Sequence, residues 1–209
     1  MISKLGFCNK KYLPTNRGFD HHYGFWLGAQ DYYHRRRAGG YDLRSDLDTV
    51  YTDNIYSTEL LSGVADKFIK DSSKSDKPMF LYVAFQTPHT PLQSPKKFHS
   101  KYRNIHNKKR RTYLQMVLAM DEAVKHIVES LEENRMLNNS IIVFMSDNGG
   151  PTNNGADNSP LRGSKGSLME GGTRTPAFVW SSKLKNRVEN RMFHITDWFP
   201  TLLQAAEIR

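Results

Sequence analysis

Cysteine is almost absent from this chain of 209 residues, in which Cys8 stands alone. No internal disulfide can form, so cysteine gives no information about the redox compartment. Long apolar runs are also absent, because the longest, Pro78–Phe85 and Ile141–Met145, fall far short of the roughly 18 residues that span a bilayer. The first residues lack the apolar stretch of a signal peptide. The sequence therefore predicts neither a membrane span nor a targeting segment.

The composition is that of a folded protein. Apolar residues make up 38% of the chain, aromatic residues 11% and charged residues 24%, which excludes a wholly disordered chain and a disulfide-stapled miniprotein. The length fits one large domain, or one and a half domains of ordinary size. Lys and Arg number 30 against 21 Asp and Glu, and the net charge of +9 favours polyanions in general. It does not choose among nucleic acid, anionic lipid and sulfated polysaccharide.

Apolar periodicity predicts an α/β protein with a mostly parallel sheet. We expect little regular structure in residues 1–55, where Asp31–Tyr41 has the composition of an exposed loop. The expected elements after it are a helix capped by Ser57 or Thr58 that stops at Asp71–Lys77, a buried strand over Pro78–Phe85, a helix over Lys108–Glu133, a buried strand over Ser140–Ser146, a short strand over Pro176–Ser181 and a helix over Asp197–Ala206. The long helix is expected to bury one stripe: Tyr113, Val117, Met120, Val124, Ile127 and Leu131.

Reactive side chains occur at the exits of the two buried strands and in the polar loop that follows the second: His89, Asp147, Asn148 and Lys165. The carboxyl ends of parallel strands meet at one edge of a sheet, so these groups are expected to face one crevice. Carboxylate and carboxamide oxygens suit Ca²⁺ or Mg²⁺, lysine supplies a fixed positive charge and histidine an adjustable proton. Such a set suits an anionic ester. Each residue taken alone also fits a surface side chain or an ordinary turn.

Ordered motifs run through essentially the whole chain: Leu13–Asp20, Tyr23-Gly24, Asp31–Tyr33, Gln86–Pro91, Met120–Val124, Ser146–Gly150, Pro160–Lys165, Glu170–Arg174 and His194–Leu202. In this combination they closely resemble the sulfatase family, in particular its arylsulfatase B-like (N-acetylgalactosamine-4-sulfatase) branch. The resemblance implies an alkaline-phosphatase-like sulfatase sheet with helices on both faces. Residues 1–209 would then be a partial sulfatase catalytic domain, without the family's N-terminal strands and smaller C-terminal domain.

The resemblance also implies roles for the reactive residues. Asp147 and Asn148 match two ligands of the family's Ca²⁺, and Lys165 matches the lysine that binds the substrate sulfate. His89 matches the histidine that helps to hold sulfate and to protonate the leaving oxygen. The expected activity is hydrolysis of sulfate esters, such as those of N-acetylgalactosamine in glycosaminoglycans, or of small aryl sulfates. No specific nucleic-acid partner is expected, and the oligomeric state stays open.

The sequence departs from the family pattern near its start. Family members attack sulfur with a formylglycine made from a Cys-x-Pro-x-Arg motif, which is absent here, and Cys8 is followed by Asn-Lys-Lys. The family's aspartate pair is absent as well, so Asp147 and Asn148 leave about half of a Ca²⁺ shell without a source. The family's Gly-Lys-Trp-His-Leu-Gly motif aligns with residues 1–6, where Lys4 takes the place of the histidine and Ile2 that of the lysine. We expect the isolated chain to be poorly soluble or partly molten.

Two alternatives remain from the sequence. A non-catalytic sulfatase-like fragment would bind polyanions through the basic clusters Arg35–Arg37 and Lys108–Arg111, unless both clusters are merely solvated faces. Nucleic-acid binding rests on charge alone. A sequon at Asn138 fits a surface glycan, and the resemblance implies a lysosomal or secreted parent protein. The absence of a signal peptide leaves the localisation of the chain as written unassigned.

Overall fold

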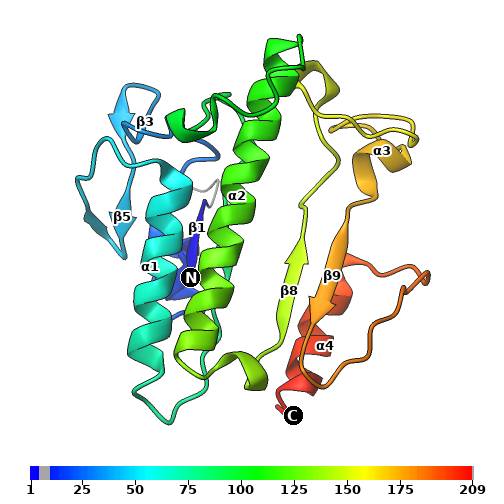
Figure 1. The fold of residues 1–209 in the computed structure, drawn as a ribbon. Helices are drawn as coiled ribbons and strands as arrows, with labels where there is room; N and C mark the ends of the chain where they lie inside the picture. The colour runs from blue at the N-terminus through cyan, green and yellow to red at the C-terminus, as the bar shows by residue number, and fades with distance from the viewer. Residues whose placement is uncertain (5–9, 209) are drawn as a thin grey trace.

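The computed structural model describes residues 1–4 and 10–208, so Cys8 and the alignment at Leu5-Gly6 lie outside the described residues. Figure 1 shows the arrangement of the strands: β1 (Ile2–Lys4), β2 (Tyr23–Phe25), β3 (Arg36–Arg37), β4 (Gly40–Tyr41), β5 (Arg44–Ser45), β6 (Asp48–Thr49), β7 (Val83–Ala84), β8 (Ile142–Met145) and β9 (Ala177–Trp180). The helices are α1 (Ser57–Ser72), α2 (Lys108–Glu133), α3 (Glu170–Thr173) and α4 (Trp198–Ala205). Short 3₁₀ turns complete the chain: η1 (Lys10–Tyr12), η2 (Pro14–Asn16), η3 (Lys96–Phe98), η4 (Leu137–Asn139), η5 (Thr152–Asn154) and η6 (Ile195–Asp197).

The expected helices α1, α2 and α4 are confirmed, and α2 begins and ends at the predicted residues. The predicted cap of α1 is wrong, because the N-cap residue is Tyr56 and no side chain caps the helix. The hydroxyl of Ser57 instead donates to the carbonyl oxygen of Tyr32 at 3.2 Å and accepts from Arg35 at 3.1 Å. A tertiary contact has therefore replaced the local cap that the sequence suggests.

The buried face of α2 is shifted from the predicted apolar stripe. The most buried apolar residues are Met116, Ala119, Ala123 and Leu131, whereas the rest of the predicted stripe is only half-buried. The buried face is shifted because α2 packs beside α1 in front of β1 (Figure 1). Small side chains on the contacting face allow the two helices to approach closely. Ile127 from the predicted stripe packs against the apolar cluster formed by Ile2, Leu61 and Ala65.

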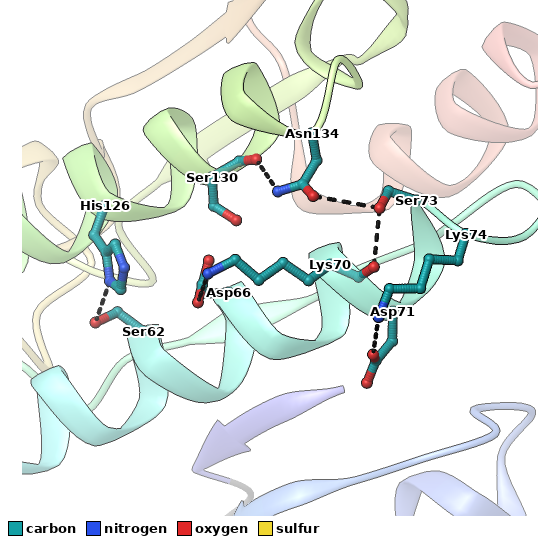
Figure 2. A network of polar contacts seen from close by, with 9 residues as sticks. All are labelled: Ser62, Asp66, Lys70, Asp71, Ser73, Lys74, His126, Ser130 and Asn134. Atoms are coloured by element: carbon teal, nitrogen blue, oxygen red, sulfur yellow. Dashed lines mark hydrogen bonds and ion pairs between the residues drawn. The ribbon is translucent and has the colours of Figure 1, made fainter.

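Polar contacts join α1 and α2 along the same seam (Figure 2). His126 lies 3.5 Å from the hydroxyl of Ser62, and Asn134 lies 3.3 Å from the hydroxyl of Ser73. The amide nitrogen of Asn134 also donates to the carbonyl oxygen of Ser130 at 2.7 Å. These contacts fix the register of the two helices. In the part of the chain that the structure describes, no helix is both long and apolar enough to cross a membrane.

The main sheet has five strands in the order β6-β5-β2-β1-β7. β1 pairs in parallel with β2 and β7, and the pairs β2–β5 and β5–β6 are antiparallel. β8 and β9 form a separate antiparallel ribbon. The prediction of a parallel sheet thus holds for β1 and its neighbours and not for the other strand pairs.

The two strands expected to be buried on both faces are shorter and more open than predicted. From Pro78–Phe85 only Val83–Ala84 is a strand, and Phe80 and Tyr82 are 65% and 50% exposed. From Ser140–Ser146 the strand keeps four residues, all half-buried. A strand needs a partner for its backbone, and β1 pairs with β7 only at Ile2 and Ser3. An apolar run alone does not show how many of its residues will find a pairing partner.

The first 55 residues contain more order than the sequence predicts. Asp31–Tyr41 is not an exposed loop, because it includes the β3–β4 hairpin and its residues Tyr32 and Arg35 are fully buried. The guanidinium group of Arg35 donates to the carbonyl oxygens of Tyr32 and Ile55 and to the hydroxyl of Ser57. Backbone acceptors from separate segments therefore hold a cation inside the fold, which local composition cannot reveal.

Candidate active site

The turn that follows β8 carries the two predicted metal ligands. Asp147 is exposed and Asn148 is half-buried. The hydroxyl of Ser146 donates to the carbonyl oxygen of Asn148 at 2.9 Å, and the side-chain nitrogen of Asn148 donates to the carbonyl oxygen of Gly149 at 3.0 Å. These local bonds fold the turn and leave the carboxylate of Asp147 toward solvent.

Close approach of backbones fixes this turn against α3. The amide of Gly149 donates to the carbonyl oxygen of Gly172 at 2.9 Å, and a Cβ atom at position 149 would lie 1.9 Å from the carbonyl oxygen of Gly171. A Cβ atom at position 171 would in turn lie 2.4 Å from the carbonyl oxygen of Gly163. Three loop segments therefore meet at positions where only glycine fits.

Gly150 joins the turn to the loop that carries Lys165. Its carbonyl oxygen accepts from the amide of Lys165 at 3.4 Å, from the hydroxyl of Ser164 at 3.3 Å and from the side-chain nitrogen of Asn158 at 2.8 Å. Asn158 also accepts from the amide of Gly150 at 3.0 Å and donates to the carbonyl oxygen of Gly163 at 3.2 Å. The backbone of Lys165 is thus held next to the turn, and its side chain is exposed.

Asn158 was not singled out in the sequence. It pairs with the backbone of a residue eight positions earlier, which no short motif indicates. The signal available was the density of Asn and Gly in a long polar loop, because Asn side chains often bind backbone groups in turns. That signal marks the loop as ordered without naming the residue that orders it.

His89 is positioned by a separate set of contacts after β7. Its Nδ1 lies 2.8 Å from the carbonyl oxygen of Thr90. A carbonyl oxygen can only accept, so we assign the proton of the neutral ring to Nδ1, which makes Nε2 the basic nitrogen. The carbonyl oxygen of His89 accepts from the phenol of Tyr32 at 2.8 Å. The backbone amide of His89 donates to the backbone carbonyl oxygen of Gln86 at 2.8 Å. Gln86 is buried and binds Gln30, so the loop is anchored in the core.

β7 and β8 lie in different sheets, so they do not share the one sheet edge expected from the sequence, but the two strands run toward the same end of the molecule. β7 runs parallel to β1, and in Figure 1 the arrows of β1 and β8 point the same way. The loops that leave β7 and β8 therefore start from the same end of the molecule. The Lys165 loop and α3 lie at that end as well (Figure 1).

The described residues do not form a complete calcium site. Among residues 1–4 and 10–208 there is no group of three His, Cys, Asp or Glu side chains that could hold a metal ion. Asp147 and Asn148 offer about three oxygens, whereas Ca²⁺ takes about six to eight. The donor set present does not fit a complete Ca²⁺ site.

The N-terminus of α2 contacts the same loop system, which the sequence did not predict. Lys109 Nζ donates to the carbonyl oxygen of Asn153 at 2.9 Å, and Arg110 donates to that of Gly155 at 3.0 Å. Burial raises the pKa of Tyr113, with Arg110 opposing the rise and Asp147 adding to it, so Tyr113 lies within electrostatic reach of both. The guanidinium carbon of Arg110 is 5.9 Å from the centre of the Tyr113 ring.

One cavity of about 300 Å³ lies elsewhere, in the groove between α1 and α2. It is lined by Glu59, Lys97, Glu122 and His126, among others, and by none of the four reactive residues predicted from the sequence. The loop edge that carries Asp147, Asn148 and Lys165 is by contrast a largely open surface.

Comparison with known proteins identifies the family. The family model described as Sulfatase matches residues 2–208. The chain belongs to the Sulfatase family. This sulfatase chain is 42% identical over 218 aligned positions to arylsulfatase J of Mus musculus, with 99% of the chain and 36% of that relative covered. It is 31% identical to N-acetylgalactosamine-6-sulfatase of Canis lupus familiaris, with 94% of the chain and 40% of that relative covered.

Solved sulfatase structures share the fold. The crystal structure of Ps i-CgsB in complex with k-i-k-neocarrahexaose superposes with a TM-score of 0.82 at 35% identity, covering 87% of the chain and 44% of that protein. The putative sulfatase yidJ from Bacteroides fragilis gives a TM-score of 0.70 at 25% identity, covering 91% of the chain and 45% of that protein. The alkaline-phosphatase-like sulfatase fold expected from the motifs is confirmed. The sulfatase chain spans less than half the length of these relatives.

The finer branch expected from the motifs is not specifically supported. The relatives carry the names arylsulfatase J and N-acetylgalactosamine-6-sulfatase, which support a sulfate ester hydrolase and not the 4-sulfatase type in particular.

Proposed function

We propose that this chain forms the sulfate-binding side of a sulfate ester hydrolase. The observation that carries the proposal is the bond from the Lys165 amide to the Gly150 carbonyl oxygen, which holds the Lys165 loop against the turn of Asp147 and Asn148. A fixed cation and two oxygen ligands thereby share one loop edge. Membership of the Sulfatase family over residues 2–208 supports this assignment.

The proposed roles follow from the chemistry of each side chain. Lys165 binds the sulfuryl oxygens with its permanent charge, which gains strength as charge develops on them. His89, whose Nε2 is the basic nitrogen in the neutral ring, binds sulfate when protonated and can then pass that proton to the leaving oxygen. Asp147 and Asn148 contribute part of a Ca²⁺ shell. The 209 residues contain no Cys-x-Pro-x-Arg motif, so we derive no attacking group from this chain.

The proposed substrates are sulfate esters of N-acetylgalactosamine-containing glycosaminoglycans, or small aryl sulfates. Two names support this class: arylsulfatase J and N-acetylgalactosamine-6-sulfatase, both given to relatives of the chain. The Ps i-CgsB structure, which holds a neocarrahexaose, supports a saccharide ligand. The 4-sulfatase type stays part of the proposal.

Binding of a small sulfate ester tests the role of Lys165. We expect 4-nitrophenyl sulfate to bind the chain about 10-fold more weakly after Lys165→Ala, since one charge-assisted contact contributes about 1.5 kcal/mol or more. Lys183→Ala is the matched control, because Lys183 is also an exposed loop lysine and lies beyond β9. Calorimetric titration measures both. Equal affinities of wild type and Lys165→Ala would reject the proposed site.

Calcium titration tests the partial metal site. We expect the chain to bind Ca²⁺ in the millimolar range or not at all, because Asp147 and Asn148 supply about half the shell or less. Asp147→Asn should abolish whatever binding calorimetry detects, whereas Asp157→Asn, in an exposed acid of the neighbouring loop, should not. A micromolar dissociation constant would show that other ligands complete the site.

The proposed localisation is lysosomal or secreted, with a glycan at Asn138. Asn138 lies in η4 and is exposed, so a transferase could reach the sequon. Expression behind a heterologous signal peptide, followed by mass spectrometry, tests the glycan. An unmodified Asn138 in that product would contradict the assignment.

A further inference from the structure

The positive charge of this protein is concentrated in one stretch. No Asp or Glu occurs between Asp76 and Asp121, and residues 96–111 hold eight cations: Lys96, Lys97, Lys101, Arg103, Lys108, Lys109, Arg110 and Arg111. We call residues 96–111 the basic segment. The other 22 of the 30 Lys and Arg residues nearly balance the 21 acidic residues of the whole chain. Almost the entire net charge therefore resides in this segment.

Most of this charge is exposed and unneutralised. Lys101, Arg103, Lys108 and Lys109 are exposed. In the part of the chain that the structure describes, Lys97 is the member of the segment that takes part in ion pairs, with Glu59 and Glu122. The segment thus presents a field of one sign to solvent, which attracts and concentrates polyanions.

The end of the segment is placed where its charge is unfavourable for folding. Lys108–Arg111 form the first turn of α2, which contains no acidic residue. The N-terminus of a helix carries a partial positive charge, so a cation there is unfavourable. Local rules broken in this way tend to mark functional positions, and a bound polyanion would relieve the repulsion.

The basic segment also adjoins the candidate active site. Lys109 and Arg110 bind the carbonyl oxygens of Asn153 and Gly155, in the loop that follows the turn of Asp147 and Asn148. Figure 1 shows the start of α2 at the end of the molecule that carries the loops around α3. A polymer with one sulfate at Lys165 could therefore lie with its neighbouring units along the segment.

We propose that the basic segment is a binding surface for sulfated polysaccharide, distinct from the Lys165 site, that holds the units flanking the ester to be cleaved. The choice of a sulfated glycan rests on the proposed function. Nucleic acid is disfavoured because the segment has little aromatic surface for stacking: Phe98 is buried, and Tyr102 is the one exposed phenol or larger ring among its described residues, beside the small imidazole rings of His99 and His106. The surface adds affinity for polymers and none for a small ester.

Charge variants with equal net charge test the proposal. The test variant is Lys101→Gln/Arg103→Gln/Lys108→Gln, whose side chains are exposed and make no hydrogen bond or ion pair among the described residues. The control is Lys67→Gln/Lys183→Gln/Lys185→Gln, also three exposed cations. Binding of chondroitin sulfate is measured at several salt concentrations. We expect about 10-fold weaker binding and a salt slope smaller by about three contacts in the test variant, and less than about 2-fold change in the control.

Two outcomes would overturn the proposal. Equal losses in the test and control variants would show a general charge effect. Duplex DNA bound by wild type as tightly as chondroitin sulfate at equal charge concentration would show a surface without preference for sulfated glycans.

A small ester separates this proposal from the proposed function. Binding of 4-nitrophenyl sulfate should be unchanged in the test variant and weakened by Lys165→Ala. If Lys165→Ala has no effect on the ester while the polymer result holds, the proposed sulfate site fails and the basic segment still stands as a polyanion surface. If the test variant weakens the small ester as much as the polymer, the two surfaces are not distinct and the inference is rejected.

Discussion

The two halves of this protein are stabilised in different ways. Residues 1–4 and 10–139 contain the buried apolar clusters, one around Ile2, Leu61 and Ala65 and one around Tyr32 and Met116. Among described residues 140–208 the buried positions are only glycine and alanine: Gly149, Gly155, Ala156, Gly171 and Gly172. All four residues of β9 are exposed, and no residue of α4 is buried. The half that carries Asp147, Asn148 and Lys165 therefore has no apolar core of its own among its described residues.

This difference predicts which substitutions will destabilise each half. The first half buries large side chains, so loss of atoms there opens cavities and orphans polar groups. The loops around Lys165 are held by backbone hydrogen bonds and by glycines in contact, so a single added methyl group is the damaging change.

Arg35→Ala should produce the largest loss of stability. It removes the donors to the carbonyl oxygens of Tyr32 and Ile55 and leaves a cavity, and each orphaned buried acceptor costs about 1–3 kcal/mol. We expect the free energy of unfolding to fall by about 3–5 kcal/mol in urea titrations. Arg36→Ala is the matched control, because Arg36 is the exposed neighbour and should change stability by less than about 0.5 kcal/mol. Similar losses in both variants would contradict the buried position of Arg35.

Gly149→Ala should have the next largest effect and should act on the second half. The new Cβ atom would lie 1.9 Å from the carbonyl oxygen of Gly171, so the turn or α3 must move. We expect a local cost of up to about 3 kcal/mol. Hydrogen exchange should become faster at the amide of residue 149, which donates to the carbonyl oxygen of Gly172, and at the amides of the Lys165 loop. The exchange rates in α1 should stay unchanged.

Gly63→Ala is the matched control for that change. Gly63 lies in α1, and a Cβ atom there meets nothing within 4 Å. The substitution should stabilise the helix by about 0.5–1 kcal/mol. If Gly149→Ala were tolerated as well as Gly63→Ala, the close packing of the site loops would be wrong.

The sequence reveals the long helices well and the strands poorly. The spacing of apolar residues in α2 is periodic over seven turns, so its bounds were predicted correctly, although contact with α1 shifted its buried face. Pro78–Phe85 has no period, and its strand extends only as far as β1 pairs with it. Strand length depends on a partner that lies far away in the sequence.

The sequence predicted the residues of the candidate site but not the residues that hold their loops in place. Motifs point to Lys165 and to the turn at Asp147, and the structure holds the backbones of their two loops together. Asn158 was not predicted, and Arg35 was assigned to an exposed basic cluster although it is buried, because both side chains bind backbone groups that no motif indicates. A side chain that binds backbone leaves no complementary residue type to find. The proposed roles of His89 and Lys165 stay predictions until binding is measured.

Stability should fall with acid because of His22. Burial lowers the pKa of His22 to about 4, and the residue is 2% exposed. The unfolded chain, with a pKa near 6.5, takes up the proton first, so His22 destabilises the fold as the pH drops from about 6.5 to about 4. Between pH 7 and pH 5, we expect the free energy of unfolding of wild type to fall by about 2 kcal/mol more than that of His22→Gln, measured by urea unfolding.

His106→Gln is the control for the titration. His106 is an exposed histidine, so His106→Gln controls for the loss of a histidine at the surface. A wild-type pH profile that His22→Gln does not flatten would mean that His22 is solvated, and that the first half is less tightly closed than the contrast requires.

Lys97→Met should give the smallest effect, and it probes how the first half is joined at its surface. Lys97 Nζ lies 2.8 Å from the carboxylates of both Glu122 and Glu59, and these hydrogen bonds raise its pKa. The folded lysine therefore stays charged through the neutral range, and its contribution is lost only as the pH rises above about 10.4. All three side chains are about half exposed, so solvent screening limits the loss to about 0.5–1 kcal/mol.

Lys96→Met is the control, because Lys96 is an exposed neighbour outside this network, and it should cost less. Added salt should narrow the difference in stability between the two variants, because screening weakens the ion pairs. A gap that persists in high salt would indicate that the ammonium group of Lys97 acts through its contact with the Phe98 ring, whose centre lies 5.0 Å from Nζ, rather than through the two ion pairs.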